Sequence, residues 1–264
     1  MGPAEDTEQG FPLLFSNKSH VGAVREENED YLGYYRADHL HVFLVADGMG
    51  GAVAGALASR TAVEAAEEAL GPRLGRQAPG RALAAAVEAA NTACLELQRD
   101  HPDLDGLGTT LDLLLVDGPD AWWAHVGDGR IYRVHRARGV QLTRDHSVVQ
   151  KMVDDGLLEP AAAAGHPHRH VLYKAIGRSD VVEADLSSEP VALVPGDSLV
   201  LCSDGLSDVV SASEIGRAVE DLGPERACEE LVDLALRRGG SDNLTLQVVH
   251  RGNPRRSWRQ WNGA

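Results

Sequence analysis

The order of strand-like and helix-like segments most limits the folds open to this chain of 264 residues. Residues 41–47 (HVFLVAD) form an apolar run rich in β-forming residues, which predicts a buried strand. Two alanine-rich segments, 52–70 and 81–99, repeat their apolar residues at helical spacing and predict long helices. Short apolar runs between residues 108 and 140, separated by turn sequences such as DGPD and GDG, predict an antiparallel meander.

The second half of the chain returns to strands without a regular alternation of strand and helix. Strands are expected at 181–186, 198–203 and 243–250, with a helix at 224–238 between the last two and a short helix at 145–154. A parallel doubly wound sheet would require strict βαβ alternation, which this order lacks. The pattern therefore predicts an α+β fold with antiparallel sheets.

The chain is expected to form one domain over residues 1–264, with a core at about 12–250. Residues 145–185, which we call the flap, include two prolines and the tract HPHRH and predict an exposed, mobile segment. Residues 251–264 (RGNPRRSWRQWNGA) are expected to be a frayed basic tail.

Charge and composition exclude several classes of function. The chain has 25 Lys and Arg against 40 Asp and Glu, and its net charge of -15 opposes binding to nucleic acid or to an anionic membrane. Its apolar runs fall short of the roughly 20 residues that a membrane span needs, and the acidic N-terminus lacks the basic region of a signal peptide. We therefore expect a cytoplasmic protein.

The three cysteines point to neither a disulfide framework nor thiol chemistry. Cys94, Cys202 and Cys228 are widely separated and form no CxxC motif. None is followed six positions later by arginine, so the phosphate-binding loop of cysteine-dependent phosphatases is absent. We expect buried, reduced thiols.

Acidic residues recur beside expected strand ends and glycine turns: Glu29 and Asp30 in RxxNED, Asp47 in ADGMGG, Asp204 in SDG and Asp242 in GGSDN. Carboxylates at strand ends are held by a rigid scaffold, and glycine allows the backbone to approach a ligand closely. Carboxylates and waters are the ligands that Mg²⁺ and Mn²⁺ prefer. A single Asp-Gly pair is more simply a turn, but the repeated arrangement predicts a site for divalent ions.

Eight segments carry a closer resemblance to a known family. In chain order they are RxxNED from Arg25, ADGMGG from Ala46, LGTT from Leu107, HVGDGR from His125, LTRDHS from Leu142, AIG from Ala175, PGDSLVLCSDGLSD from Pro195 and GGSDNLT from Gly239. The ordered set, which spans almost the whole chain, resembles the bacterial metal-dependent serine/threonine phosphatases of the PPM (protein phosphatase 2C-like) family. The resemblance implies a four-layer α-β-β-α sandwich of two antiparallel sheets flanked by helices.

The resemblance also implies a set of metal ligands. Asp47 would bridge two Mn²⁺ or Mg²⁺ ions. Asp204 and Asp242 would complete the shell of one ion, and Glu29 with the backbone carbonyl of Gly48 would bind the other.

Four further positions receive roles by the same resemblance. Arg25 would bind the phosphate, and Asp128 would help Asp204 hold a weaker third ion, although a plain hairpin turn is the alternative interpretation of Asp128. Asp30 and Asn243 would support the ligands by hydrogen bonding. Some relatives carry a histidine after the Asp-Gly pair as the proposed acid; here the residue is Met49, so no side-chain acid is assigned.

The implied reaction is hydrolysis of phosphoserine and phosphothreonine in proteins by a hydroxide that bridges the two ions. The alternative from another class is a pseudophosphatase, an inactive module that binds a partner. Because Glu29, Asp47, Asp204 and Asp242 are all present, the enzyme is favoured. The implied partners are phosphoproteins, among them a Ser/Thr kinase, its targets or a sigma-factor regulator, and we expect a monomer.

Some residues depart from the family pattern or suggest other sites. Ala52 and Ala56 stand where His and Glu are common, and Gly129 stands where Ser is usual, which predicts an effect on rate or metal affinity. The alternating histidines of the flap, His166, His168 and His170, are interpreted as solvated loop residues. Ser203 and Ser241 are expected to be turn or capping residues because no nucleophile elbow surrounds them.

Overall fold

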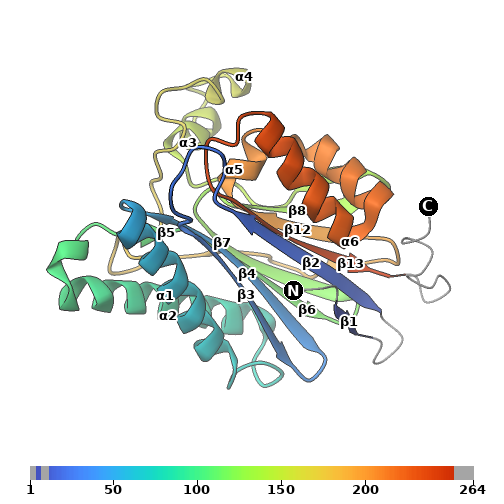
Figure 1. The fold of residues 1–264 in the computed structure, drawn as a ribbon. Helices are drawn as coiled ribbons and strands as arrows, with labels where there is room; N and C mark the ends of the chain where they lie inside the picture. Colours follow the sequence, from blue (N-terminus) through green and yellow to red (C-terminus); the bar gives the residue numbers. More distant parts are fainter. Residues whose placement is uncertain (1–3, 7–11, 253–264) are drawn as a thin grey trace.

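The computed structural model describes residues 4–6 and 12–252, which form four layers (Figure 1). Two antiparallel sheets pack face to face, and helices cover the outer face of each sheet. The predicted α+β sandwich is therefore confirmed. The single-domain prediction stays a prediction, and residues 253–264 of the expected tail lie outside the described part; Arg251 belongs to the last strand.

All strand pairs within the two sheets are antiparallel. The first sheet contains, in spatial order, β1 (Ala4–Asp6), β2 (Leu13–His20), β13 (Leu244–Arg251), β12 (Ser198–Cys202), β8 (Arg130–His135) and β9 (Arg138–Gln141). The second contains β10 (Asp185–Leu186), β7 (Asp120–Val126), β6 (Leu111–Asp117), β4 (Leu40–Met49) and β3 (Asp30–Ala37), with β11 (Val191–Ala192) beside β7 and β5 (Gly108–Thr109) beside β4.

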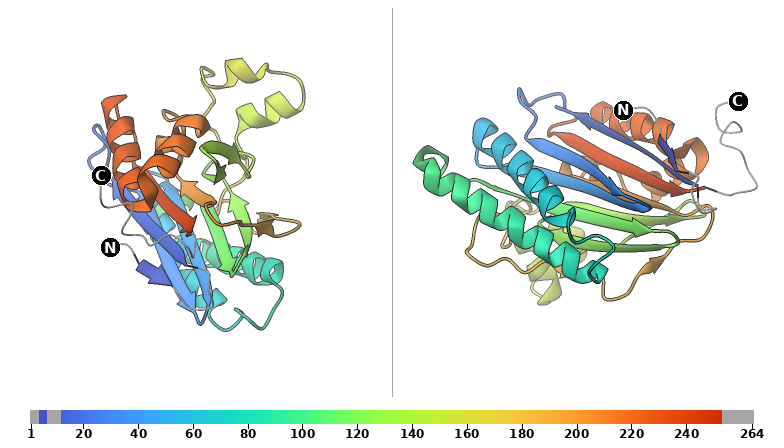
Figure 2. Two further views of the ribbon diagram at one scale, coloured as in Figure 1. Left: turned by 90° about the vertical axis from the view of Figure 1, so that its right-hand side faces the viewer. Right: turned by 90° about the horizontal axis from the view of Figure 1, so that it is seen from below.

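The helices lie outside the sheets. The second sheet is covered by α1 (Ala52–Leu70) and α2 (Pro79–Asp100), which is followed by a 3₁₀ turn at Pro102–Leu104. The first sheet is covered by α6 (Ala212–Arg237), with the short α5 (Asp204–Ser207) at the end of β12. Figure 2 shows α1 and α2 on one side of the sandwich and α6 on the other.

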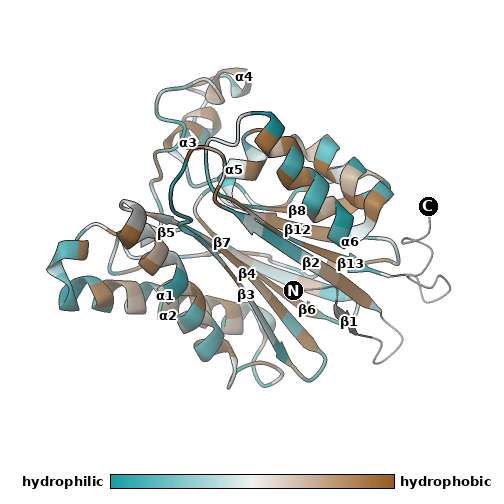
Figure 3. Cartoon of the chain, viewed as in Figure 1, coloured by the Kyte–Doolittle hydropathy of each residue, from teal (hydrophilic) through white to brown (hydrophobic). Residues whose placement is uncertain are grey.

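Strict alternation along the strands explains why both faces of each sheet are buried. In β4, Val42 and Leu44 pack against α1 and α2, whereas Phe43 and Val45 pack into the layer between the sheets. Successive side chains of a strand point to opposite faces, so one continuous apolar run serves two cores. Figure 3 shows β4 and β12 as mainly hydrophobic and the helices with both hydrophilic and hydrophobic residues.

The predicted meander is divided between the two sheets. β6 pairs with β7 in the second sheet, and β8 pairs with β9 in the first. The segment from Gly127 to Gly129 therefore crosses from one sheet to the other. The prediction of one continuous meander was wrong because β8 finds a distant partner, β12.

Other boundaries also differ from the sequence-based predictions. Strands β2 and β3 were not predicted, and the strand expected at 181–186 is reduced to Asp185–Leu186. The helix expected at 224–238 is the second half of α6, which follows the non-helical residue Gly223 (φ 73°) and ends at Arg237; the first half, from Ala212, was not predicted. A capping box between Ser211 and Glu214 begins it.

The flap projects from one end of the sandwich (Figure 2). It contains α3 (Val148–Asp154), which lies within the short helix expected at 145–154, and α4 (Pro160–Ala163), which was not predicted. None of the helices in the described ranges combines the length and apolar character of a membrane-spanning segment.

Candidate functional site

Carboxylates from both sheets meet at one end of the layer between them. Asp30 begins β3 and pairs with Asp47 on β4, whereas Asp204 follows β12 and Asp242 precedes β13. Since β12 and β13 belong to the first sheet and β3 and β4 to the second, the four residues approach from opposite sides. The fold therefore brings together acidic residues separated by about 200 positions.

Asp47, Asp204 and Asp242 line a cavity of about 420 Å³. Its lining includes every residue predicted as a metal ligand or phosphate-binding group: Arg25, Glu29, Asp47, Gly48, Asp128, Asp204 and Asp242. Asn243 also lines the cavity, whereas Asp30 is not among the lining residues.

Asp47 is held by the backbone and by two threonines. Its N–H donates to Oγ1 of Thr110 (2.9 Å), and its carbonyl accepts from the N–H of Thr110 (2.9 Å) and from Oγ1 of Thr109 (2.8 Å). Both threonines are buried. These bonds fix the backbone that carries the Asp47 carboxylate, and they give the LGTT segment a structural purpose that sequence reasoning did not assign.

Glycines make room for Glu29. The N–H of Gly48 donates to the carbonyl of Glu29 (3.1 Å), and a Cβ at Gly55 would overlap the Glu29 carboxylate. Ser59, on α1, donates its hydroxyl to the same Glu29 carbonyl (2.6 Å). Gly55 and Ser59 are supporting residues that the sequence analysis missed, and only their helical spacing on one face of α1 could have indicated them.

Asn243 holds the loop that carries Arg25 and Glu29. Its Oδ1 accepts from the N–H of Glu29 (2.8 Å), and its Nδ2 donates to the carbonyls of Val21 and Glu27 (2.9 Å each). Both the oxygen and the nitrogen of the side-chain amide thus form hydrogen bonds with the backbone of one loop. The structure places Asn243 where a residue supporting the ligands is expected.

Arg25 lies at the mouth of the cavity with its side chain 45% exposed. Its Nη2 donates to Oδ2 of Asp242 (2.9 Å), and its Nη1 lies 3.6 Å from Oε1 of Glu29. A guanidinium has five donors, so these contacts orient Arg25 while leaving N–H groups for an anion.

Asp30 lies behind Asp47 and is buried. Its Oδ2 accepts from the hydroxyl of Ser203 (2.8 Å), whose oxygen accepts from the N–H of Thr245 (3.1 Å). Its Oδ1 has no hydrogen-bond partner among the described residues. Burial raises the pKa of Asp30 to about 7. Ser203 precedes α5 and holds Asp30, which fits a structural residue better than a nucleophile.

Asp128 joins the cavity from the crossing between the sheets. Because β7 and β8 do not pair with each other, the plain hairpin turn was the wrong alternative for this residue. Whether Asp128 binds an ion is left as a proposal.

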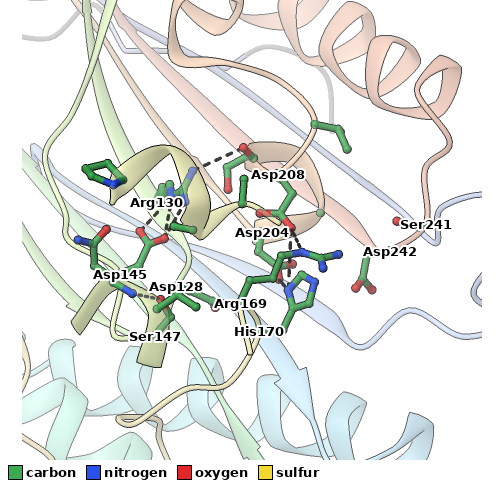
Figure 4. Close-up of a pocket in the computed structure, with 18 residues that line it drawn as sticks. Asp128, Arg130, Asp145, Ser147, Arg169, His170, Asp204, Asp208, Ser241 and Asp242 are labelled. Atoms are coloured by element: carbon green, nitrogen blue, oxygen red, sulfur yellow. Dashed lines mark hydrogen bonds and ion pairs between the residues drawn. The ribbon is translucent and has the colours of Figure 1, made fainter. Parts of the chain in front are cut away.

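His170 corrects the interpretation of the flap histidines. It is exposed, as expected, but Nδ1 lies 3.4 Å from Oδ2 of Asp204 and 3.9 Å from Oδ2 of Asp208. Figure 4 shows Arg169 and His170 reaching from the flap toward these carboxylates. They border a second cavity of about 610 Å³ that adjoins the first at Asp128, His170, Asp204 and Asp242. Nothing in the sequence pattern separated His170 from its neighbours.

Electrostatic repulsion dominates the carboxylate cluster. Burial, followed by the charges of neighbouring carboxylates, raises the pKa of Asp47 and of Asp128 well above the ordinary value. Burial acts in the same direction on Asp204, but hydrogen bonds with His170 and Asp47 and the charges of His170 and Arg130 together outweigh it and lower the pKa of Asp204. Without cations, such a cluster retains protons or destabilises the fold.

The donor set fits hard divalent cations. Five acidic side chains line the first cavity, and Arg25 and His170 are the only basic side chains among its described lining residues. Oxygen ligands without cysteine suit Mg²⁺ or Mn²⁺ better than a soft metal. The residues present can therefore hold the ions that the sequence predicts.

Comparisons with known proteins agree with this geometry. The family model for protein phosphatase 2C matches residues 18–246. The serine/threonine protein phosphatase PstP of Mycobacterium tuberculosis is 36% identical over 239 residues, and the match covers 90% of this chain. The chain spans only 45% of the length of that relative. Protein phosphatase PhpP of Streptococcus pneumoniae is 36% identical, with 87% of this chain and 94% of PhpP covered.

Solved structures show the same fold. A crystal structure of the M. tuberculosis phosphatase PstP superposes with a TM-score of 0.82 at 36% identity, covering 91% of this chain and 99% of that one. A structure described as the catalytic domain of PstP in complex with two manganese ions gives a TM-score of 0.80 at 34% identity, with 91% and 99% covered.

Proposed function

The chain belongs to the protein phosphatase 2C family, and we propose that it is a metal-dependent phosphatase that hydrolyses phosphoserine and phosphothreonine in proteins. The observation that carries the proposal is the single cavity in which Glu29, Asp47, Asp204 and Asp242 converge beside Arg25. Mn²⁺ or Mg²⁺ is the cofactor class that this donor set and the manganese-bound relative support.

Within this proposal the carboxylates divide two ions between them. Asp47 would serve both ions, Asp204 and Asp242 one of them, and Glu29 with the carbonyl of Gly48 the other. When bound, the two ions polarise the phosphoryl group and make a water nucleophilic at neutral pH. Asp128, beside Asp204 in the cavity, would contribute to a weaker third ion.

The chain's own residues bind and orient the phosphate. Arg25 offers guanidinium N–H groups at the cavity mouth, where Asp242 and Glu29 limit its movement. A planar fork of this kind can contact two phosphoryl oxygens at once. Asn243 keeps the loop of Arg25 in place through the backbone of Val21, Glu27 and Glu29. Binding and orientation of the phosphate are therefore assigned to this loop.

The inactive pseudophosphatase is not favoured. An inactive module would be expected to have lost part of its carboxylate set, whereas all of the predicted ligands line one cavity. The relatives reported above are named as phosphatases. Nothing in the described part of the chain favours the inactive alternative.

The substrates within this proposal are phosphoproteins. A Ser/Thr kinase, its targets and a sigma-factor regulator stay predictions, as do a cytoplasmic location and a monomeric state. The net charge of -15 supports the expectation that nucleic acid is not a partner.

The test is hydrolysis of a phosphothreonine peptide and of p-nitrophenyl phosphate by the purified protein with Mn²⁺, with EDTA and, for Asp204→Asn, with Mn²⁺. The proposal predicts release of phosphate by wild type in Mn²⁺ only. Asp117→Asn is the matched control because Asp117 ends β6 away from the cavity lining, with a 42% exposed side chain that lies 3.2 Å from Nε2 of His39. If folded wild type released no phosphate at saturating Mn²⁺ and Mg²⁺, the pseudophosphatase would replace the enzyme.

A further inference from the structure

A buried, hydrogen-bonded pair of Asp112 and His125 lies behind the crossing that carries Asp128. Asp112 on β6 and His125 on β7 are directly paired in register, and both side chains are fully buried. Nδ1 of His125 lies 2.7 Å from Oδ1 of Asp112, and Nε2 lies 3.0 Å from the carbonyl oxygen of Arg144. The carbonyl of Arg144 can only accept, so Nε2 donates to it, and Nδ1 shares one hydrogen bond with the carboxyl group of Asp112.

The second carboxylate oxygen of Asp112 lies beside Gly129, the position at which serine is usual in the family. Oδ2 of Asp112 has no hydrogen-bond partner among the described residues, and a Cβ placed on Gly129 would overlap it. The backbone of Gly129 lies outside the left-handed region, so glycine is not required there by conformation. Glycine at position 129 is instead required by the carboxylate at position 112.

The other side of Asp128 is held by His146. The N–H of Gly127 donates to Nδ1 of His146 (3.0 Å), and the backbone N–H of His146 donates to the carbonyl of Gly127 (2.6 Å). The rings of His146 and His125 stack with centroids 4.7 Å apart. The Asp112–His125 pair therefore contacts, through the stacked ring of His146, the residue that precedes Asp128.

This support matters because the crossing lacks the bonds of a hairpin. β7 and β8 lie in different sheets, so no ladder between them fixes the three residues from Gly127 to Gly129. Their position depends on contacts from neighbouring segments. Asp112 reaches Gly129, and His146 reaches Gly127, so both neighbours of Asp128 are in contact with the same buried group of side chains.

We propose that Asp112, with its partner His125, is a positioning residue for Asp128, and that Gly129 is the matching small residue that this carboxylate demands. The pair acts through the crossing and touches neither substrate nor ion. The inference rests on the proposed function only where hydrolysis is measured, since metal binding by the folded protein reports on Asp128 independently.

The test is a double-mutant cycle with Asp112→Ala, Gly129→Ala and the two combined. Urea midpoints and calorimetric Mn²⁺ binding are measured for each protein without substrate. We expect Gly129→Ala alone to weaken the weakest Mn²⁺ site by about 10-fold or more, the effect typical of losing a supporting residue of a metal site. In the Asp112→Ala background the same change should cost much less, because the overlap is gone.

Two controls identify the site and the specificity of the effect. Asp128→Asn should abolish the same weak binding step, and Gly80→Ala, at a glycine with no atom within 4 Å of an added Cβ, should leave it unchanged. His125→Gln should weaken that step while leaving the tighter Mn²⁺ steps within about 3-fold, because outer supports act on the ligand they contact.

The inference would be overturned if Gly129→Ala had equal effects on Mn²⁺ binding in both backgrounds. It would also be overturned if the urea midpoints were coupled while every Mn²⁺ step stayed unchanged, since the pair would then support only the fold. The inference would also fail if the wild-type protein showed no third Mn²⁺ binding step, because Asp128 would then have no ion to bind. Coupled Mn²⁺ binding in a protein without phosphatase activity would support the inference and contradict the proposed function.

Discussion

The two ends of the layer between the sheets differ in what their side chains contribute. At one end Phe15, Phe43 and Leu199 pack with Val249 in an apolar core. At the other end the strands finish in carboxylates, and the buried residues are largely polar. The strands supply the apolar end, and the segments that join their ends supply most of the carboxylates, so a single architecture contains a stabilising end and a repulsive end.

This difference shows that the apolar end must offset the destabilising effect of the carboxylates at the other end. Burial of apolar surface stabilises the fold by roughly 25 cal/mol for each Å² removed from water. Raised pKa values at Asp47 and Asp128 show that the acidic end opposes the fold when no cation is bound. Because the charges of this site destabilise the folded protein, removing one of them is expected to reduce function and increase stability.

The largest effect is expected from Asp47→Asn at the acidic end. Loss of the carboxylate placed between the two proposed ions should lower kcat/KM on the order of 10³-fold, because metal-bound charge stabilisation is worth several kcal/mol. Initial rates with a phosphothreonine peptide at saturating Mn²⁺ measure this. A variant within threefold of wild type would remove Asp47 from the centre of the site.

At the apolar end, Phe43→Ala should lower the free energy of unfolding by about 3–5 kcal/mol, the usual cost of truncating a buried phenylalanine. Phe43 is 1% exposed, and its ring centroid lies 5.1 Å from that of Phe15, edge to face, and 5.2 Å from that of Tyr34. Urea denaturation measures the loss. Mn²⁺ affinity of the folded variant should stay unchanged, and a parallel loss of affinity would break the separation of the two ends.

Acid should weaken the fold through His250, which lies outside the acidic cluster. Burial lowers the pKa of His250 to about 4 from an ordinary 6.5, and its Nδ1 pairs with the hydroxyl of Ser198. As pH falls from 6.5 toward 4, the unfolded chain takes up a proton that the folded chain refuses, so stability is lost across this window by roughly 3 kcal/mol in total.

His250→Gln tests that pH dependence. Unfolding free energies in EDTA at pH 7 and pH 5 should differ less for the variant than for wild type, since the titrating ring is gone. Identical differences would show that His250 does not carry the effect. EDTA keeps the acidic end in the same state in both proteins.

The smallest effect is expected from Arg25→Lys at the cavity mouth. Lysine keeps the charge but loses the planar fork, and loss of one hydrogen bond of about 1 kcal/mol should lower kcat/KM about fivefold. The change should appear mainly in KM for a phosphopeptide. Unchanged kinetics would mean that Arg25 does not contact phosphate.

The residues of the candidate site were predicted from the sequence more completely than the fold that brings them together. Asp47, Asp204 and Asp242 could be found because a carboxylate beside a glycine at a strand end is a local pattern. Their convergence depends on two sheets stacking, which local patterns indicate only through a family resemblance. The seven predicted ligands and phosphate-binding residues line one cavity, but ion binding by them stays a proposal.

Other structural features could not be predicted from the sequence because they depend on residues that are distant along the chain. Strand β8 pairs with β12 rather than with its neighbour β7, and no local signal distinguishes these choices. The first half of α6 could have been predicted from the capping box of Ser211 and Glu214, whereas the second half, after the break at Gly223, was predicted from its local pattern. His170 lies near Asp204 only because the flap brings it to the cavity, and the polar character of the flap sequence does not indicate this contact.

The most direct test of the account is the unfolding free energy of wild type and Asp47→Asn, each in EDTA and in Mn²⁺. The account predicts that Asp47→Asn is the more stable protein in EDTA, because a repelling carboxylate is removed. In Mn²⁺ the order should reverse, with wild type stabilised by about 2.7 kcal/mol at a Mn²⁺ concentration 100 times Kd. A less stable Asp47→Asn in EDTA, with wild type indifferent to Mn²⁺, would contradict the assignment of the acidic end as a metal centre.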